Sequence, residues 1–111
     1  MEITEKKMKR AVLFEVQGRI DHGSAPDLDQ KLVEALKTGH YRLAIDMSGV
    51  DYISSAGIRA LIAARKQARR WNRGDLKLAA LQPRIVEVFD LVGISPLFEH
   101  FDSPVDAVGS F

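Results

Sequence analysis

Two adjacent hydroxyl groups, those of Ser54 and Ser55, are the side chains in this sequence best placed to take part in chemistry. They stand between a short apolar run that predicts a strand and a long segment rich in Ala, Leu and Arg that predicts a helix. The unpaired N–H groups at a helix start attract anions, so a phosphate on either hydroxyl would lie in a favourable field. Serine is also a common helix cap, and the local pattern alone favours that plainer role.

A serine between a strand and a helix is also typical of a hydrolase nucleophile. The pattern G-x-S-x-G centred on Ser55 requires a glycine at position 53, where this chain has Ile53. A chain of 111 residues is also short for a hydrolase sheet with the loops of a catalytic triad. A small serine hydrolase is therefore the less favoured alternative, and we expect a binding protein and not an enzyme.

The remaining residue types favour neither a metal nor a cofactor. His22, His40 and His100 form no HExxH pattern, and the chain has no cysteine and no glycine-rich nucleotide motif. A formal net charge of +1 argues against nucleic acid or a membrane as a partner. The basic run Arg65–Arg70 then predicts a solvated helix face, or a contact for an acidic partner surface. The absence of cysteine and of a membrane-length apolar run favours a cytoplasmic location.

The elements that must position the two serines alternate regularly along the chain. Strands are expected at Ala11–Val16, paired as a hairpin with a shorter strand around Ile3, and at Arg42–Met47, Asp75–Ala80 and Leu97–Phe101. Helices are expected from a Ser24 cap to Gly39, from Gly57 to Asn72 before a terminating Gly74, from Pro83 to Gly93, and over Pro104–Val108. This order predicts an α/β fold in a single domain over residues 1–111, with a mainly parallel mixed β-sheet opened by an antiparallel hairpin and about four helices.

The helix that follows the serines has two distinct faces at helical spacing. One face is expected to lie in the core and carries Gly57, Leu61, Ala64, Ala68 and Trp71. The opposite face is basic and carries Arg59, Lys66, Arg70 and Arg73. Ile62 falls near the basic side, where it is either an exposed apolar contact or a partly covered flank residue.

A wider pattern surrounds the serines. It consists of Asp46–Ile58 (DMSGVDYISSAGI), Gly18–Asp21 (GRID), Leu81–Pro83 (LQP) and Phe89–Ile94 (FDLVGI). These segments resemble the STAS domain, and within it the bacterial anti-sigma factor antagonists. The resemblance covers nearly the whole chain and implies the STAS fold.

The resemblance implies a protein that, when unphosphorylated, binds an anti-sigma factor with serine kinase activity and so frees a sigma factor. Phosphorylation reverses the binding, and a serine phosphatase restores it. The family's phosphoacceptor falls on Ser55. Ser54 stands where the family usually has Asp, and Ala56 where it has Ser or Thr, so Ser54 is the alternative acceptor. We expect a monomer or weak homodimer.

The expected partner-binding surface combines the two serines with neighbouring positions of the motif and of the helix. It comprises Asp21, Asp46, Ser54, Ser55, Gly57, Ile58, Arg59 and Ile62. The resemblance places Asp21 and Asp46 near the same surface as Ser55. Arg59 lies one helical turn after Ser55 and is placed to pair with a phosphate, which Asp46 and Asp51 would repel if close. The other hypothesis that keeps this fold is a STAS subunit that is not phosphorylated and docks on a transporter or another signalling complex.

Overall fold

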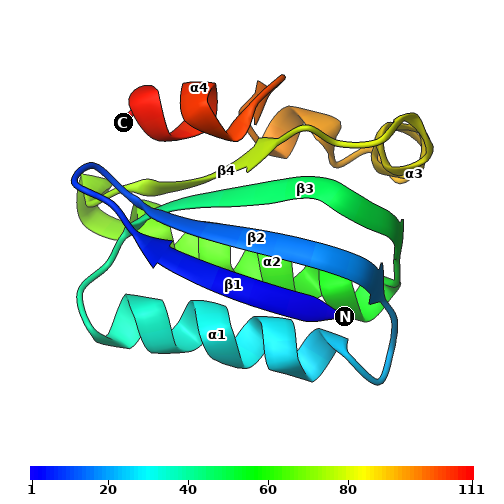
Figure 1. Ribbon diagram of the computed structural model, residues 1–111, viewed down its shortest axis with the longest axis horizontal. Helices are drawn as coiled ribbons and strands as arrows, with labels where there is room; N and C mark the ends of the chain where they lie inside the picture. Colours follow the sequence, from blue (N-terminus) through cyan, green and yellow to red (C-terminus); the bar gives the residue numbers. More distant parts are fainter.

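The chain folds around a five-stranded sheet with the strand order β1-β2-β3-β4-β5 in a computed structural model that describes residues 1–111 (Figure 1). The strands are β1 (Glu2–Lys7), β2 (Val12–Ile20), β3 (Arg42–Ile53), β4 (Asp75–Ala79) and β5 (His100–Phe101). The helices are α1 (Ala25–Lys37), α2 (Ser55–Arg69), α3 (Pro83–Leu91) and α4 (Pro104–Gly109). The β1–β2 pair is antiparallel and the other pairs are parallel, which confirms the expected fold class.

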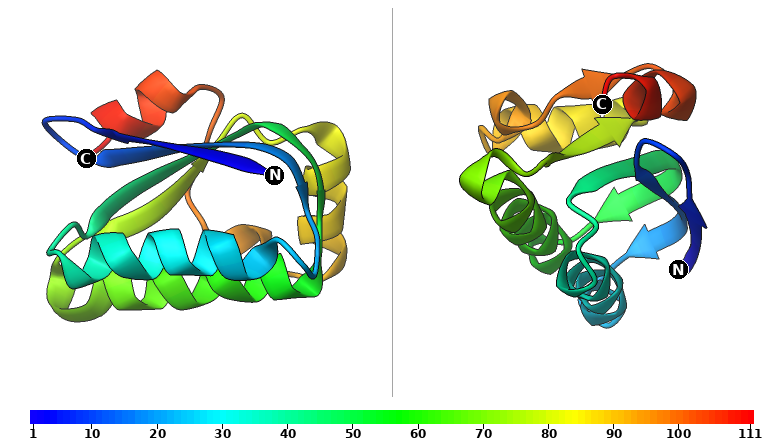
Figure 2. Two further views of the ribbon diagram at one scale, coloured as in Figure 1. Left: turned by 60° about the horizontal axis from the view of Figure 1, so that its bottom comes forward. Right: turned by 90° about the vertical axis from the view of Figure 1, so that its left-hand side faces the viewer.

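The helices divide between the two faces of the sheet. α1 and α2 lie side by side under one face and α4 lies over the other, while α3 lies at the end of the sheet where β3 leads into α2 (Figure 2). Alternate residues of the strands point to the α1–α2 face because the side-chain period of a strand is two. The main core on that face contains Phe14, Ile45, Leu78 and Phe89, all fully buried.

The opposite face has a smaller core under α4, formed by Leu13, Ala44, Ala79 and Ala107. The buried Lys77 lies beside it on β4. The Lys77 ammonium donates to Ser110 Oγ at 2.9 Å, lies 3.2 Å from a Glu99 carboxylate oxygen, and sits 4.3 Å from the centre of the Phe111 ring. These contacts give the buried charge the partners it needs and hold the end of the chain against the sheet.

The two central strands run farther than their apolar runs predict. β2 continues beyond Val16 to Ile20, and β3 continues beyond Met47 to Ile53, so the segment between the expected strand and the serines is largely strand. Pairing of β3 with β4 ends at Asp46 and Ala79, but pairing with β2 extends to Ile20 and Ile53. The extension of β3 carries polar residues such as Ser48 and Asp51, because only one neighbouring strand covers it. These polar residues interrupt the apolar pattern from which a strand is predicted.

α2 ends earlier than predicted. The helix stops at Arg69 and a 3-10 turn follows, in which Trp71 and Asn72 have φ values of 57° and 55°. Trp71 is consequently 76% exposed and does not belong to the core. Gly74 is needed here for space, because a Cβ on it would lie 2.0 Å from the Tyr41 carbonyl oxygen. The last strand is also shorter than expected, since Ser95–Leu97 forms a 3-10 turn.

The start of α1 is held by a reciprocal pair of hydrogen bonds. Ser24 precedes the helix as predicted, but its hydroxyl accepts from the Asp21 N–H at 2.9 Å and accepts nothing from the helix. The Asp21 carboxylate accepts from the Ser24 N–H at 2.9 Å and from the Ser24 hydroxyl at 3.0 Å. These bonds, the backbone one most strongly, hold the pKa of Asp21 below its ordinary value, since they favour the charged carboxylate.

Replacing Gly74 with alanine will destabilise the fold, because the added methyl group meets the rigid main chain at Tyr41. We expect Gly74→Ala to lower the free energy of unfolding by about 2–3 kcal/mol, measured by urea denaturation. Gly109→Ala is the control, since a Cβ there has no neighbour within 4 Å; its effect is expected to stay within about 0.5 kcal/mol. Equal effects of the two substitutions would contradict this role for Gly74.

The Asp21 carboxylate will stabilise the turn before α1 only while it is ionised. Its pKa is lowered in the folded state, so its contribution is complete above the unfolded-state value of about 4 and is lost as the pH falls through the lowered value. We expect Asp21→Asn to lower Tm at neutral pH, and the difference from the parent chain to shrink below about pH 4. Glu87→Gln, which removes an exposed carboxylate without a hydrogen-bond partner, is the control. A Tm difference for Asp21→Asn that grows in acid would refute the prediction.

Candidate functional site

The two serines have different environments at the start of α2. Ser54 is the N-cap, with an extended backbone, and its hydroxyl accepts from the Gly57 N–H at 3.2 Å. The Ser54 N–H donates to the Ile20 carbonyl at 2.8 Å, which fixes the cap to the end of β2. Ser55 is the first helical residue, and its side chain is exposed and makes no hydrogen bond to the protein. Only the Ser55 hydroxyl is therefore both accessible and unengaged.

Gly57 places the first turn of α2 directly on the ends of the two central strands. A Cβ at this position would lie 2.6 Å from Ile20 Cγ2 and 2.8 Å from Ile53 Cγ1, distances that packed carbon atoms do not reach. Gly57 is buried. It therefore holds the first turn of α2, and with it Ser55, against the strand ends.

Asp46 does not lie near Ser55, contrary to the expectation. It alternates with Ile45 and Met47, which point into the main core, so its side chain points to the opposite face of the sheet. There its carboxylate accepts from the Ser48 N–H at 3.0 Å. The strand from Asp46 to Ile53 spans about 20 Å, and the expected repulsion between Asp46 and a phosphate on Ser55 does not arise. Asp51 is exposed near the carboxyl end of β3.

A shallow groove adjoins Ser55 between the first halves of α1 and α2. Its floor is made by small side chains, among them Ala25, Ala56 and Ala60, and its volume is about 420 Å³. His22 lines it from before α1, and Arg59 lines it from α2. The α1 side of this groove was not predicted from the sequence, because only the packing of α1 against α2 brings the two segments together (Figure 2).

The remaining expected positions are an exposed cation, an exposed carboxylate and two packed side chains. Arg59 is exposed, stands four residues after Ser55, and forms no ion pair within 4.0 Å. Ile58 and Ile62 are partly buried against the main core, so Ile62 is a partly covered flank residue. Asp21, exposed before α1, lies next to His22 of the groove. Apart from Asp46, the expected residues thus surround the start of α2 or support it.

The site has no hydrogen bond of the kind that activates a serine nucleophile. The Ser55 hydroxyl has no histidine or carboxylate within hydrogen-bonding distance. No group of three or more His, Cys, Asp or Glu residues is arranged to hold a metal ion. Every helix is too short or too polar to cross a bilayer. The geometry presents an exposed hydroxyl, a helix N-terminus and a cation one turn away.

Comparison with known proteins places this arrangement in a family. BtrV of Bordetella bronchiseptica, which is named as an anti-sigma factor antagonist, is 32% identical over 111 residues, covering 100% of this chain and 95% of BtrV. The crystal structure of an anti-sigma factor antagonist from Mycobacterium paratuberculosis is similar with a TM-score of 0.86 at 22% identity, over 98% of this chain and 92% of that one.

The Bacillus anti-sigma factor antagonist SpoIIAA is similar in two states. Its unphosphorylated form matches with a TM-score of 0.80 at 16% identity, covering 99% of this chain and 98% of SpoIIAA. Its phosphorylated form matches with a TM-score of 0.76 at 15% identity, covering 98% of each chain. The family description of the STAS domain matches residues 2–107, and the chain therefore belongs to the STAS domain family.

Proposed function

We propose that this chain is an anti-sigma factor antagonist whose docking surface surrounds Ser55 and is switched by phosphorylation of that residue. In the unphosphorylated state the surface binds an anti-sigma factor that has serine kinase activity, which releases the sigma factor in the cytoplasm. Phosphorylation by that partner ends the interaction, and a serine phosphatase restores it. The relatives named as anti-sigma factor antagonists support this role, which is regulatory and not catalytic.

The observation that carries the proposal is the difference between the two hydroxyls. A kinase needs an accessible hydroxyl oxygen, and Ser55 is exposed with no hydrogen bond to the protein. The Ser54 hydroxyl is partly buried and accepts from the Gly57 N–H, so its phosphorylation would remove the cap of α2. This difference favours Ser55 over the alternative acceptor Ser54.

The local electrostatics favour a switch that acts on docking and leaves the fold intact. A phosphate adds about −1.5 to −2 charge, and at the first residue of α2 it meets the positive end of the helix. Arg59, which has no other ion pair, stands one turn away. A partner packed over Ser55 would instead have to bury a hydrated dianion, which costs more than the few kcal/mol needed to lose binding.

Removing the Ser55 hydroxyl will abolish phosphorylation while the alternative acceptor remains. Incubated with its cognate anti-sigma factor kinase and ATP, the parent chain is expected to gain the mass of one phosphate, and Ser55→Ala is expected to gain none. Ser54→Ala is the matched control: it loses a helix cap worth about 1 kcal/mol, but it is expected to remain a substrate.

Partner binding separates the switch from constitutive docking. Ser55→Asp is expected to weaken binding to the anti-sigma factor, and Ser55→Ala to bind and stay bound in ATP. If Ser55→Ala is phosphorylated and released like the parent chain, the switch does not act at Ser55. If the parent chain docks on another partner without modification, it is a docking subunit of a different complex.

Phosphorylation of Ser55 will stabilise the isolated domain. The helix N-terminus and Arg59 together are expected to add about 1 kcal/mol, which raises Tm by about 4 °C. In Arg59→Gln roughly half of this gain is expected to disappear, whereas Lys66→Gln, which removes a cation farther along the same helix, keeps it. The measurement is thermal unfolding of phosphorylated and unphosphorylated chains. A Tm that falls on phosphorylation would show that the modification acts through unfolding.

A further inference from the structure

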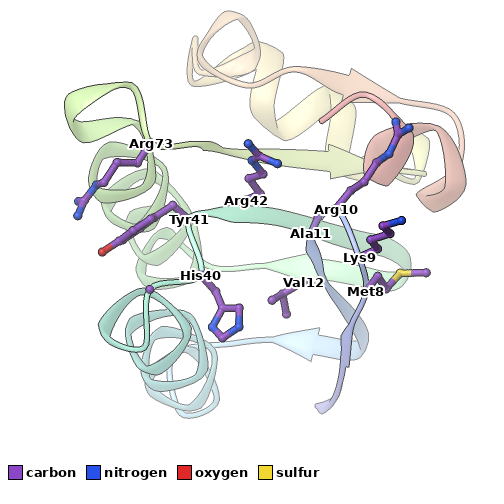
Figure 3. A pocket seen from close by; sticks show the side chains of 10 residues that line it. Met8, Lys9, Arg10, Ala11, Val12, His40, Tyr41, Arg42 and Arg73 are labelled. Carbon is purple, nitrogen blue, oxygen red and sulfur yellow. The ribbon is translucent and has the colours of Figure 1, made fainter.

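A second surface lies at the end of the molecule opposite Ser55. It is formed where the β1–β2 turn approaches the segment between α1 and β3, and it contains a cavity of about 230 Å³ (Figure 3). Four cations line this cavity, Lys9 and Arg10 from the turn, Arg42 from the start of β3, and Arg73 from the segment after α2. The lining contains no carboxylate. The length of α2, about 20 Å, separates it from Ser55.

The positive charges of this cavity are not neutralised within the protein. Lys9 and Arg42 form no ion pair and no side-chain hydrogen bond. Arg10 donates to the Gly109 carbonyl at 3.0 Å, and Arg73 donates to the Arg70 carbonyl at 3.1 Å. Asp75, the carboxylate that begins β4, is already engaged by Arg69 at 3.3 Å. Cations without carboxylate partners form a surface that attracts an acidic ligand.

The arrangement of the side chains favours an extended ligand over a single small anion. In Figure 3 the charged ends of Arg10, Lys9 and Arg42 spread around the rim of the cavity and do not converge on one point. Arg73 extends to the far side, where its guanidinium lies 3.8 Å from the centre of the Tyr41 ring. A ligand that engages all of these groups must carry several negative charges along its length.

A second, partly apolar cavity adjoins the cationic one across the Arg73–Tyr41 stack. Its volume is about 320 Å³; Val33, Leu36 and Tyr41 form its apolar side, and Lys37, Gln67 and Arg73 line the rest. The exposed Trp71 is in contact with the same group, since the Arg73 guanidinium lies 5.2 Å from its ring centre. Trp, Tyr and Arg are the residues enriched at the energetic centres of protein–protein interfaces. Together with the apolar side of the second cavity, this composition fits a protein segment that carries both carboxylates and an apolar side chain.

We propose that these two cavities form a second docking surface that binds an acidic peptide segment of a partner protein. An apolar side chain of the segment enters the cavity lined by Val33 and Leu36, and its carboxylates pair with Lys9 and Arg42 across the Tyr41–Arg73 stack. Because this surface lies about 20 Å from Ser55, the segment stays bound whether or not Ser55 is phosphorylated. The protein then holds one partner constantly while it exchanges another.

The test measures binding of a short fluorescein-labelled peptide of alternating leucine and glutamate to the full chain, by fluorescence anisotropy. We expect Lys9→Gln combined with Arg42→Gln to weaken binding roughly fivefold to tenfold. Val33→Ser is expected to weaken it roughly threefold through the apolar cavity. Lys31→Gln combined with Arg84→Gln removes the same net charge from exposed positions elsewhere, and is expected to leave the affinity within about twofold.

Ser55→Asp is expected to bind the peptide like the parent chain. Equal losses in the two double variants would show non-specific attraction and overturn the proposal. So would full affinity in Val33→Ser, an affinity changed by Ser55→Asp, or an absence of measurable binding. A single-stranded oligonucleotide, or vesicles containing phosphatidylglycerol, could bind more tightly than the peptide and lose this binding in the Lys9→Gln and Arg42→Gln double variant. Such a result would also overturn the proposal, because the surface would then recognise a different kind of polyanion.

Discussion

The parallel pairing of β2 with β3 beyond the end of β4 determines where the candidate site lies. It carries both strands to Ile20 and Ile53, and the Ser54 N–H completes it by donating to the Ile20 carbonyl. The first turn of α2 then rests on these two isoleucines, at a distance that only the missing side chain of Gly57 permits. Ser55 is exposed because its helix begins on this fixed support, so its position does not depend on a mobile loop.

The sequence was sufficient for the element order and, to within two residues, for the start of α2, which was expected at Gly57 and lies at Ser55. Strand and helix periodicity and the serine cap are local signals. The sequence was not sufficient for features that depend on tertiary contacts. The extension of β3 is polar because one neighbouring strand covers it, and its alternation turns Asp46 to the face opposite the serines. Trp71 follows the helical spacing, but α2 ends at Arg69 and the chain turns away from the helix with a positive φ at Trp71.

A net charge of +1 conceals an uneven distribution of charge over the molecule. Lys9, Arg42 and Arg73 are far apart in the sequence, and the parallel sheet brings them together because its strands begin at one edge. The other edge carries the carboxyl ends of the strands, the start of α2 and the exposed Ser55. Composition therefore gives the total charge but not its distribution, and a binding partner meets the local field.

The separation of the two edges limits how far a phosphate can act. Charges in solution are screened within about 8 Å at physiological ionic strength, less than half of the roughly 20 Å spanned by α2. A conformational change transmitted along α2 is also not expected, because a phosphate at the first residue of this helix stabilises it. The electrostatic effect of the proposed phosphate on Ser55 would therefore be limited to its own end of the domain. The domain would then regulate the proposed docking at Ser55 without disturbing the second surface.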